Sequence, residues 1–286
     1  MWNAILMGVM LVAAPAQQEK DTTIAVDPRA RLRMEDVRGD VVIHTWSRPE
    51  MRVHASDVED GRLHVSAGGP TVTVGIEPAS GRWNRRNSAD FELTIPATMS
   101  ISLSGPNGDV HIEGTQGEVN VETTSGDIQL QGGSGIVSIH TVSGDVSVTG
   151  ARARTEVHAT SGDLQLSQIT GDVIAQTING DVSLHRIDAT SVEASTVSGD
   201  LQYEGTVKDG GRYSLTSHSG DITFDMPPST GAIIGVSTFS GEFNTDIPVQ
   251  LTEQRRGQRF SFTVGSGGAR IELQSFSGDI HLARGR

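Results

Sequence analysis

Apolar and polar residues alternate in short runs along most of the chain, and these runs recur at a nearly fixed interval. One run follows each of a series of Gly-acid pairs, with apolar residues two and four positions after the glycine. A second run has its apolar residues seven and five positions before the glycine. Because successive side chains of a strand point to opposite faces, this period predicts two half-buried strands per repeat. The inward column two positions after the glycine contains Ile128, Val146, Leu164, Val182, Leu201, Ile222 and Phe243.

The corner glycines are spaced by 18, 18, 18, 18, 19, 21 and 21 residues from Gly108 to Gly241. A strand must turn sharply there, and glycine reaches positive φ values without a Cβ clash. Repetition at a fixed interval is typical of a solenoid. We therefore predict an all-β, single-stranded β-solenoid, a right-handed β-helix with two short strands per coil of 18–21 residues and irregular caps at both ends. Its structural corners are Gly108, Gly126, Gly144, Gly162, Gly180, Gly199, Gly220, Gly241 and Gly278.

The pattern divides the chain into four segments. Residues 1–16 are predicted to be a cleaved signal peptide, because an apolar run at 5–12 precedes a small-x-small cleavage sequence at 14–16. Residues 17–104 are predicted to form a β-strand segment that caps the solenoid, residues 105–246 the regular coils, and residues 247–286 a hairpin and the last coil. In the first of these segments after the signal, strands are predicted at 22–26, 41–44, 52–55, 63–65, 72–76 and 91–95.

Aromatic residues replace Val and Ile in the later coils, where the spacing of the corners also increases. The larger side chains need more room between the strands, so we expect the solenoid to widen toward its C-terminal end. The residues predicted to form this larger core are Tyr203, Tyr213, Phe224, Phe239 and Phe243.

Composition narrows the range of partners. The formal net charge is −13 and the sequence pI is about 5.0, which argues against nucleic acid or an anionic membrane surface as the partner. The chain has no cysteine, which excludes disulfides, thiolate nucleophiles, Cys-ligated zinc and a lipidated cysteine anchor. After signal cleavage no transmembrane segment is expected, because the apolar run at 5–12 is too short to span a bilayer.

The acids beside the corner glycines raise the question of a metal. Stacked coils would place these acids roughly 5 Å apart, so like charges repel along one edge. A row of Ca²⁺ ions could relieve the repulsion. Alternatively, each Asp hydrogen-bonds its own corner, which suits a pattern with one glycine per corner better. The candidate cation ladder consists of Asp127, Asp145, Asp163, Asp181 and Asp200.

The sequence predicts no cofactor and no catalytic residue. None of the histidines has the spacing of a metal-binding motif. His140 and His158 share one column, so we expect them to be stacked neighbours on an outward face. The serine of each Ser-Gly-Asp corner has no paired base, and Asn179 replaces it in one coil, as expected of a turn and not of a nucleophile.

The iterated corners resemble a bacterial family of β-strand-repeat proteins that are described as proposed adhesins and whose function is undetermined. The resemblance rests on the Thr-x-Ser-Gly-Asp stretches Thr123–Ile128, Thr141–Val146 and Thr196–Leu201. It also rests on Val37–Ile43 followed by Trp46, and on Ile95-Pro96 just before the repeats. It implies an exported β-solenoid located in the periplasm, at the cell surface or outside the cell, and it brings no catalytic residues with it.

Two outward columns of mostly uncharged polar residues are candidate contact surfaces. They suit a protein or glycan of the cell envelope, although any solvated strand face has the same composition. We predict a non-catalytic, adhesin-like binding or scaffold protein. The alternatives are an envelope-stress signalling partner of a membrane regulator and a polysaccharide-active β-helix enzyme. One column contains Gln129, Ser147, Gln165, Ser183 and Gln202, and the other contains Glu122, His140, His158 and Gln176.

Overall fold

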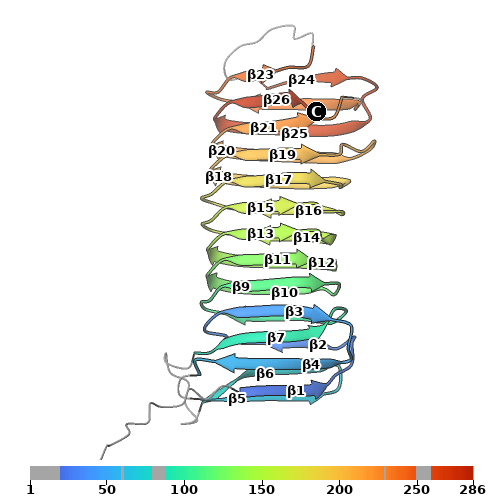
Figure 1. Ribbon diagram of the computed structural model, residues 1–286. Coiled ribbons are helices and arrows are strands. Elements are labelled where there is room, and N and C mark those ends of the chain that lie inside the picture. Colours follow the sequence, from blue (N-terminus) through green and yellow to red (C-terminus); the bar gives the residue numbers. More distant parts are fainter. Residues whose placement is uncertain (1–19, 59–60, 79–87, 229, 249–258, 286) are drawn as a thin grey trace, which may run out of the picture.

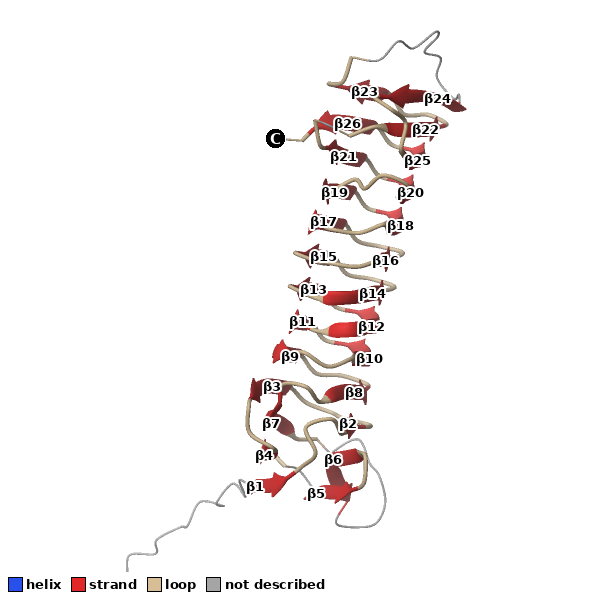
Figure 2. Cartoon of the chain, turned by 90° about the vertical axis from the view of Figure 1, so that its right-hand side faces the viewer, coloured by secondary structure: helices blue, strands red, loops and turns tan. Residues whose placement is uncertain are grey.

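The computed structural model describes residues 20–58, 61–78, 88–228, 230–248 and 259–285, which form a long rod of stacked strands (Figure 1). Two sheets of 13 strands each run along the rod, and the described residues contain no helix. Seen from the side, the sheets are two columns of strands joined by turns and loops in each coil (Figure 2). The prediction of an all-β solenoid with two strands per coil is confirmed.

We call the sheets A and B and give their strands in spatial order from the N-terminal end of the rod. Sheet A consists of β1 (Lys20–Ala25), β4 (Glu50–Ser56), β7 (Asp90–Pro96), β3 (Val41–Trp46), β9 (Val110–Thr115), β11 (Ile128–Gly132), β13 (Val146–Thr149), β15 (Leu164–Ser167), β17 (Val182–Ile187), β19 (Leu201–Gly205), β21 (Ile222–Met226), β26 (Ile280–Arg284) and β23 (Phe243–Thr245). Sheet B consists of β5 (Gly61–Gly68), β6 (Thr71–Pro78), β2 (Arg31–Met34), β8 (Ser100–Gly105), β10 (Val119–Ser125), β12 (Ser134–Ser143), β14 (Arg152–His158), β16 (Val173–Gln176), β18 (Ser191–Ser198), β20 (Arg212–Ser219), β25 (Ala269–Ser277), β22 (Ala232–Thr238) and β24 (Arg259–Val264).

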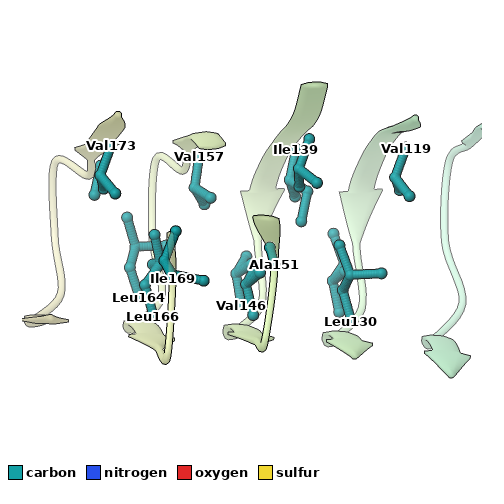
Figure 3. Packing of buried hydrophobic residues seen from close by; sticks show 14 of the residues in the cluster. Val119, Leu130, Ile139, Val146, Ala151, Val157, Leu164, Leu166, Ile169 and Val173 are labelled. Carbon is teal, nitrogen blue, oxygen red and sulfur yellow. The ribbon is translucent and has the colours of Figure 1, made fainter. Parts of the chain in front are cut away.

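In the regular part of the rod, each residue pairs in parallel with its equivalent one coil later. Ile128 lies opposite Val146, and Val146 lies opposite Leu164. On sheet B, Val119 lies opposite Val137 in the same way. The inward side chains of the two sheets meet in the space between the sheets (Figure 3). The five residues named above are almost fully buried. The predicted inward columns therefore form one continuous apolar core.

The N-terminal cap differs from the regular coils by its antiparallel pairs. Strand β4 runs antiparallel to both β1 and β7, and β5 runs antiparallel to β6. All six strands predicted in this segment are present, as β1 and β3–β7, whereas β2 and β8 were not predicted. Strand β2 alternates exposed Arg31 and Arg33 with buried Leu32 and Met34. This alternation has the same period as in the predicted strands but spans only four residues.

The last coil of the chain does not lie at the end of the rod. Strand β26 pairs with β21 on one side and with β23 on the other, and β25 likewise lies between β20 and β22. The coil of Gly278 is thus inserted between the coils of Gly220 and Gly241, so the order of the coils along the rod differs here from their order in the sequence. Strand β24 runs antiparallel to β22 at the edge of sheet B.

Some predictions fall on residues that the structure does not describe. These are the signal peptide at 1–16, residues 79–87 of the predicted N-terminal segment, and residues 249–258 of the predicted C-terminal hairpin. Within the described ranges, no helix has the length and apolar character that crossing a membrane requires.

Candidate binding edge

Each coil passes from sheet B to sheet A at a Gly-acid pair, and these corners stack into one edge of the rod. At Gly162 the backbone φ is +133°, and a Cβ atom would lie 2.2 Å from the carbonyl oxygen of Gly144. Gly278 does not have a left-handed φ, yet a Cβ atom there would lie 2.1 Å from the carbonyl oxygen of Gly220. The corner therefore requires glycine for close backbone approach as well as for φ, and the sequence argument recognised only φ.

The acids beside these glycines form a continuous chain of hydrogen bonds. Oδ1 of Asp127 accepts from the backbone N–H of Asp145 at 2.9 Å, and Oδ1 of Asp145 accepts from that of Asp163 at 2.8 Å. Each carboxylate thus binds the next coil and not its own corner, which corrects the interpretation drawn from the sequence. The same bond, 2.7–2.9 Å long, joins every neighbouring pair of what we call the acidic row: Asp90, Asp40, Asp109, Asp127, Asp145, Asp163, Asp181, Asp200, Asp221, Asp279 and Glu242.

These bonds offset the repulsion between neighbouring carboxylates, because a hydrogen bond to an ionised acceptor is stronger than one between neutral groups. Across the described part of the chain, no three His, Asp or Glu side chains are placed to hold one metal ion. A cation ladder at Asp127, Asp145, Asp163, Asp181 and Asp200 therefore stays a prediction. The hydrogen bonds of the acidic row link each coil to the next, and the row remains an exposed line of negative charge.

The residue three positions before each corner glycine is a buried hydroxyl in most coils. Thr196 donates through Oγ1 to the carbonyl oxygen of Gly180 at 3.0 Å, and Ser275 donates through Oγ to that of Gly220 at 3.2 Å. These side chains are only 4% exposed. In the motifs of Thr123 and Thr141 the hydroxyl instead donates to a carbonyl oxygen of its own corner, that of Ser125 or Ser143. The threonine of the Thr-x-Ser-Gly-Asp motif therefore satisfies a corner carbonyl, a role that the sequence did not reveal.

The residue after this hydroxyl points outward, because inward and outward positions alternate along the strand. In successive coils toward the C-terminal end, this column places apolar and aromatic side chains side by side. They are well exposed: Ile178 is 47% exposed, Val197 46%, Phe276 48% and Phe239 65%. We call the following line of five residues, in spatial order, the apolar stripe: Ile178, Val197, His218, Phe276 and Phe239.

The aromatic part of the stripe is a stack of parallel rings. The ring centroids of His218 and Phe276 are 4.8 Å apart with an interplanar angle of 8°. Those of Phe276 and Phe239 are also 4.8 Å apart, with an angle of 3°. Phe239 was predicted to lie in the core, and the structure corrects this. The inward positions of β22 are Ile234, Val236 and Thr238, so the next residue must face solvent.

A shallow groove of about 610 Å³ follows the stripe. On the side away from the acids, its floor is made of uncharged polar residues such as Ser195, Thr216 and Gln274. One cation, Arg259 of β24, lines it beside β22. On the other side of the stripe lie the corner glycines, two residues further along the chain, and the acidic row, three residues further along. The edge therefore has a polar side that includes Arg259, a mainly apolar centre and an acidic side.

The two polar columns predicted from the sequence are also in register. Gln129 lies opposite Ser147, and on the other sheet Glu122 lies opposite His140. The rings of His140 and His158 are stacked, with centroids 4.9 Å apart and an interplanar angle of 6°, as predicted. Both columns lie on the outer faces of the sheets, as the sequence predicts.

Two groups of charged residues lie on the outer face of sheet A. Near the N-terminal end, Glu113 accepts hydrogen bonds from His111 at 2.7 Å and His44 at 3.2 Å, and the bond from His111 above all lowers the pKa of Glu113. Near the C-terminal end, Asp225 lies opposite Glu204. Burial raises the pKa of Asp225 above its usual value, and the charge of Glu204 raises it further.

The chain is similar to one protein family and to several solved structures. The family model described as Toastrack DUF4097 matches residues 31–283. No curated protein matches the chain. A similar solved structure is a proposed adhesin from Bacteroides fragilis, with 14% identity, a TM-score of 0.48, and coverage of 94% of this chain and 98% of that one. Another, a proposed adhesin from Parabacteroides distasonis, has 10% identity, a TM-score of 0.41, and coverage of 93% and 98%.

Proposed function

The chain belongs to the Toastrack DUF4097 family, and on this premise we propose that it is an exported, non-catalytic binding or scaffold protein of the bacterial cell envelope, with an adhesin-like role. The observation that carries the proposal is the apolar stripe. Scattered exposed apolar residues are ordinary, but four of them aligned in one column beside a groove, with a histidine stacked among them, are a feature of interaction sites. The rod holds this line on a rigid scaffold, since every coil is bonded to the next along both sheets.

Export is supported by the apolar run and cleavage sequence within residues 1–16. Edman sequencing of the protein from its native host, together with cell fractionation, tests this part. We expect Gln17 as the first residue and recovery from the periplasm, the cell surface or the medium. An intact N-terminal Met1 in the cytoplasmic fraction would contradict it.

Binding is tested by immobilising the folded rod and passing an extract of the cell envelope over it. We expect saturable retention of a protein or glycan that is lost when the rod is thermally unfolded. Retention of nothing contradicts the proposal. Depolymerisation of a polysaccharide that one acidic substitution abolishes would instead favour the enzyme alternative.

A further inference from the structure

We infer that the apolar stripe, with the acidic row beside it, forms a docking surface for a basic amphipathic helix of a partner protein. This inference rests on the proposed function, because it presupposes a partner, and it specifies the chemistry of that partner. It follows from three properties of the edge: its period, its charge and the way its aromatic rings are presented.

The period of the stripe fits a helix better than a strand. Its aromatic members repeat every 4.8 Å along the rod. An α-helix brings an apolar residue back to the same face about every 5.4 Å, whereas an extended strand does so about every 6.7 Å. The mismatch is about 0.6 Å per step for a helix and about 1.9 Å for a strand. From Ile178 to Phe239, four steps span roughly 19 Å, which corresponds to a helix of about 13 residues.

The charge of the edge favours a cationic partner, because the acids beside the stripe outnumber Arg259, the cation that lines the groove. The acids of the same coils as the stripe are Asp181, Asp200, Asp221, Asp279 and Glu242, and all are exposed. Their hydrogen bonds to backbone N–H groups do not remove their negative charge. A second copy of this chain would bring another acidic row and a net charge of −13 toward them, which disfavours self-association through this edge. Lys or Arg along one side of a helix would complement the row.

The stacking of the aromatic rings disfavours a sugar as the ligand. A pyranose ring packs on the face of an aromatic ring, but the faces of Phe276 are covered by His218 on one side and Phe239 on the other. The stripe therefore shows mainly ring edges to a ligand. Ring edges and the methyl groups of Val197 and Ile178 form a ridge that suits aliphatic side chains at helical spacing.

The probe is a fluorescent synthetic peptide of about 14 residues, with Leu at helical spacing (i, i+3, i+4, i+7) and Lys elsewhere. One control peptide has the same composition with Leu and Lys in strict alternation, and another keeps the helical pattern but replaces Lys by Glu. Fluorescence anisotropy against the full mature chain gives the affinities. We expect the helical Lys peptide to bind at least about tenfold more tightly than either control. Equal binding of the alternating peptide, or no binding of the helical one, overturns the inference.

Variants locate the site. The double variant Phe239→Ser/Phe276→Ser should weaken binding of the helical Lys peptide about tenfold, because it removes the two phenyl rings of the stripe. The fold should not depend on these rings, since both side chains are exposed. The matched control is Val142→Ser, which lies in the same column outside the stripe, is 48% exposed, and should leave the affinity unchanged. If both variants bind as the wild type does, the inference is wrong.

A second set of variants tests the acidic row. In Asp200→Asn/Asp221→Asn/Asp279→Asn the side chain keeps a carbonyl oxygen for the neighbouring backbone N–H but loses its charge. We expect weaker binding and a shallower dependence on salt. An unchanged salt dependence contradicts the role of the row.

The envelope extract separates this inference from the function on which it rests. If the wild type retains a partner and Phe239→Ser/Phe276→Ser retains it equally well, helix docking at the stripe is wrong while the binding function stands. If the wild type itself retains nothing, the proposed function fails.

Discussion

The coils in the middle of the rod and those toward its C-terminal end share one backbone plan but fill it with different side chains. In the middle, corners are 18 residues apart and the core is made of aliphatic residues such as Val146 and Leu164. Further along, the spacing reaches 21 residues and the core contains Tyr203, Tyr213 and Phe224. The rings of Tyr203 and Phe224 are stacked with centroids 4.6 Å apart.

The additional residues of the longer coils provide polar partners for the buried tyrosines. The hydroxyl of Tyr203 donates to the carbonyl oxygen of Thr206 at 2.8 Å. That of Tyr213 donates to the carbonyl oxygen of Ala189 at 2.9 Å and accepts from the backbone N–H of Lys208 at 2.8 Å. Thr206 and Lys208 lie in the lengthened corner. A coil of this solenoid therefore accepts a larger core residue when its second corner is long enough to satisfy that residue's hydroxyl group.

The largest expected effect is a loss of stability when a corner glycine is replaced, and the size of this loss should differ between the two regions. Gly162→Ala, in the middle, should destabilise the rod by about 3–5 kcal/mol, because it combines a left-handed φ with a clash against the carbonyl oxygen of Gly144. Gly278→Ala has the clash without that φ, so we expect a loss smaller by about 1 kcal/mol. Urea unfolding measures both. Gly150→Ala, where φ is +73° and no atom lies within 4 Å, is the control and should cost only about 1 kcal/mol. Equal losses at Gly150 and Gly162 would contradict the role of close approach.

An intermediate effect is expected in the aromatic core. Tyr213→Phe should destabilise the rod by about 2 kcal/mol, because it leaves both a backbone N–H and a carbonyl oxygen without their partner. Tyr203→Phe removes a single hydrogen bond and should cost about 1 kcal/mol. Thermal and urea unfolding of the two variants give the comparison. If Tyr203→Phe were the more damaging, the lengthened corner would not be what supports the larger core.

The smallest effect concerns charge on sheet A. In the middle coils the column of Asp225 contains uncharged Thr149 and Ser167, and only the later coils place Glu204 and Asp225 there. The pKa of Asp225 is raised in the folded chain, so its ionisation disfavours the fold at neutral pH. This cost disappears as the pH falls through the raised pKa toward the ordinary value of 3.8.

Asp225→Asn should therefore stabilise the rod at pH 7 by a few tenths of a kcal/mol, since solvent screens a partly exposed group. The gain should vanish below about pH 4, where the carboxyl is protonated in both states. Unfolding curves of variant and wild type at several pH values test this. A gain that persists in acid would show that the ionisation of Asp225 is not its cause.

Much of the fold could be predicted from the sequence, because period-two alternation locked to regularly spaced glycines determines which residues face inward. Ile128, Val146 and Leu164 lie where that argument placed them. The stacking order of the last coils could not be predicted, since Phe243 and Ile280 both satisfy the same inward column. Pattern alone does not tell which of them follows Ile222.

The candidate site was largely missed, and for identifiable reasons. Phe239 was assigned to the core because it is aromatic, although the alternation through Val236 and Thr238 already places it outside. The acidic row was recognised, but its hydrogen bonds depend on the register between coils, which a single corner does not contain. The apolar stripe could be recognised only with Phe239 placed outside the core and with the last coil inserted between its neighbours. Only that insertion places Phe276 between His218 and Phe239.

The inserted coil has a consequence for the order in which the molecule is completed. During synthesis the segment of Gly241 emerges before the segment of Gly278, and at that moment Ile222 has no neighbour on its open side. Phe243 fits that place in pattern, so a nascent chain is able to close one coil too early. The native arrangement requires this position to be vacant, or vacated, when Ile280 arrives. The rod therefore cannot reach its final form before the segment that contains Ile280 has been synthesised.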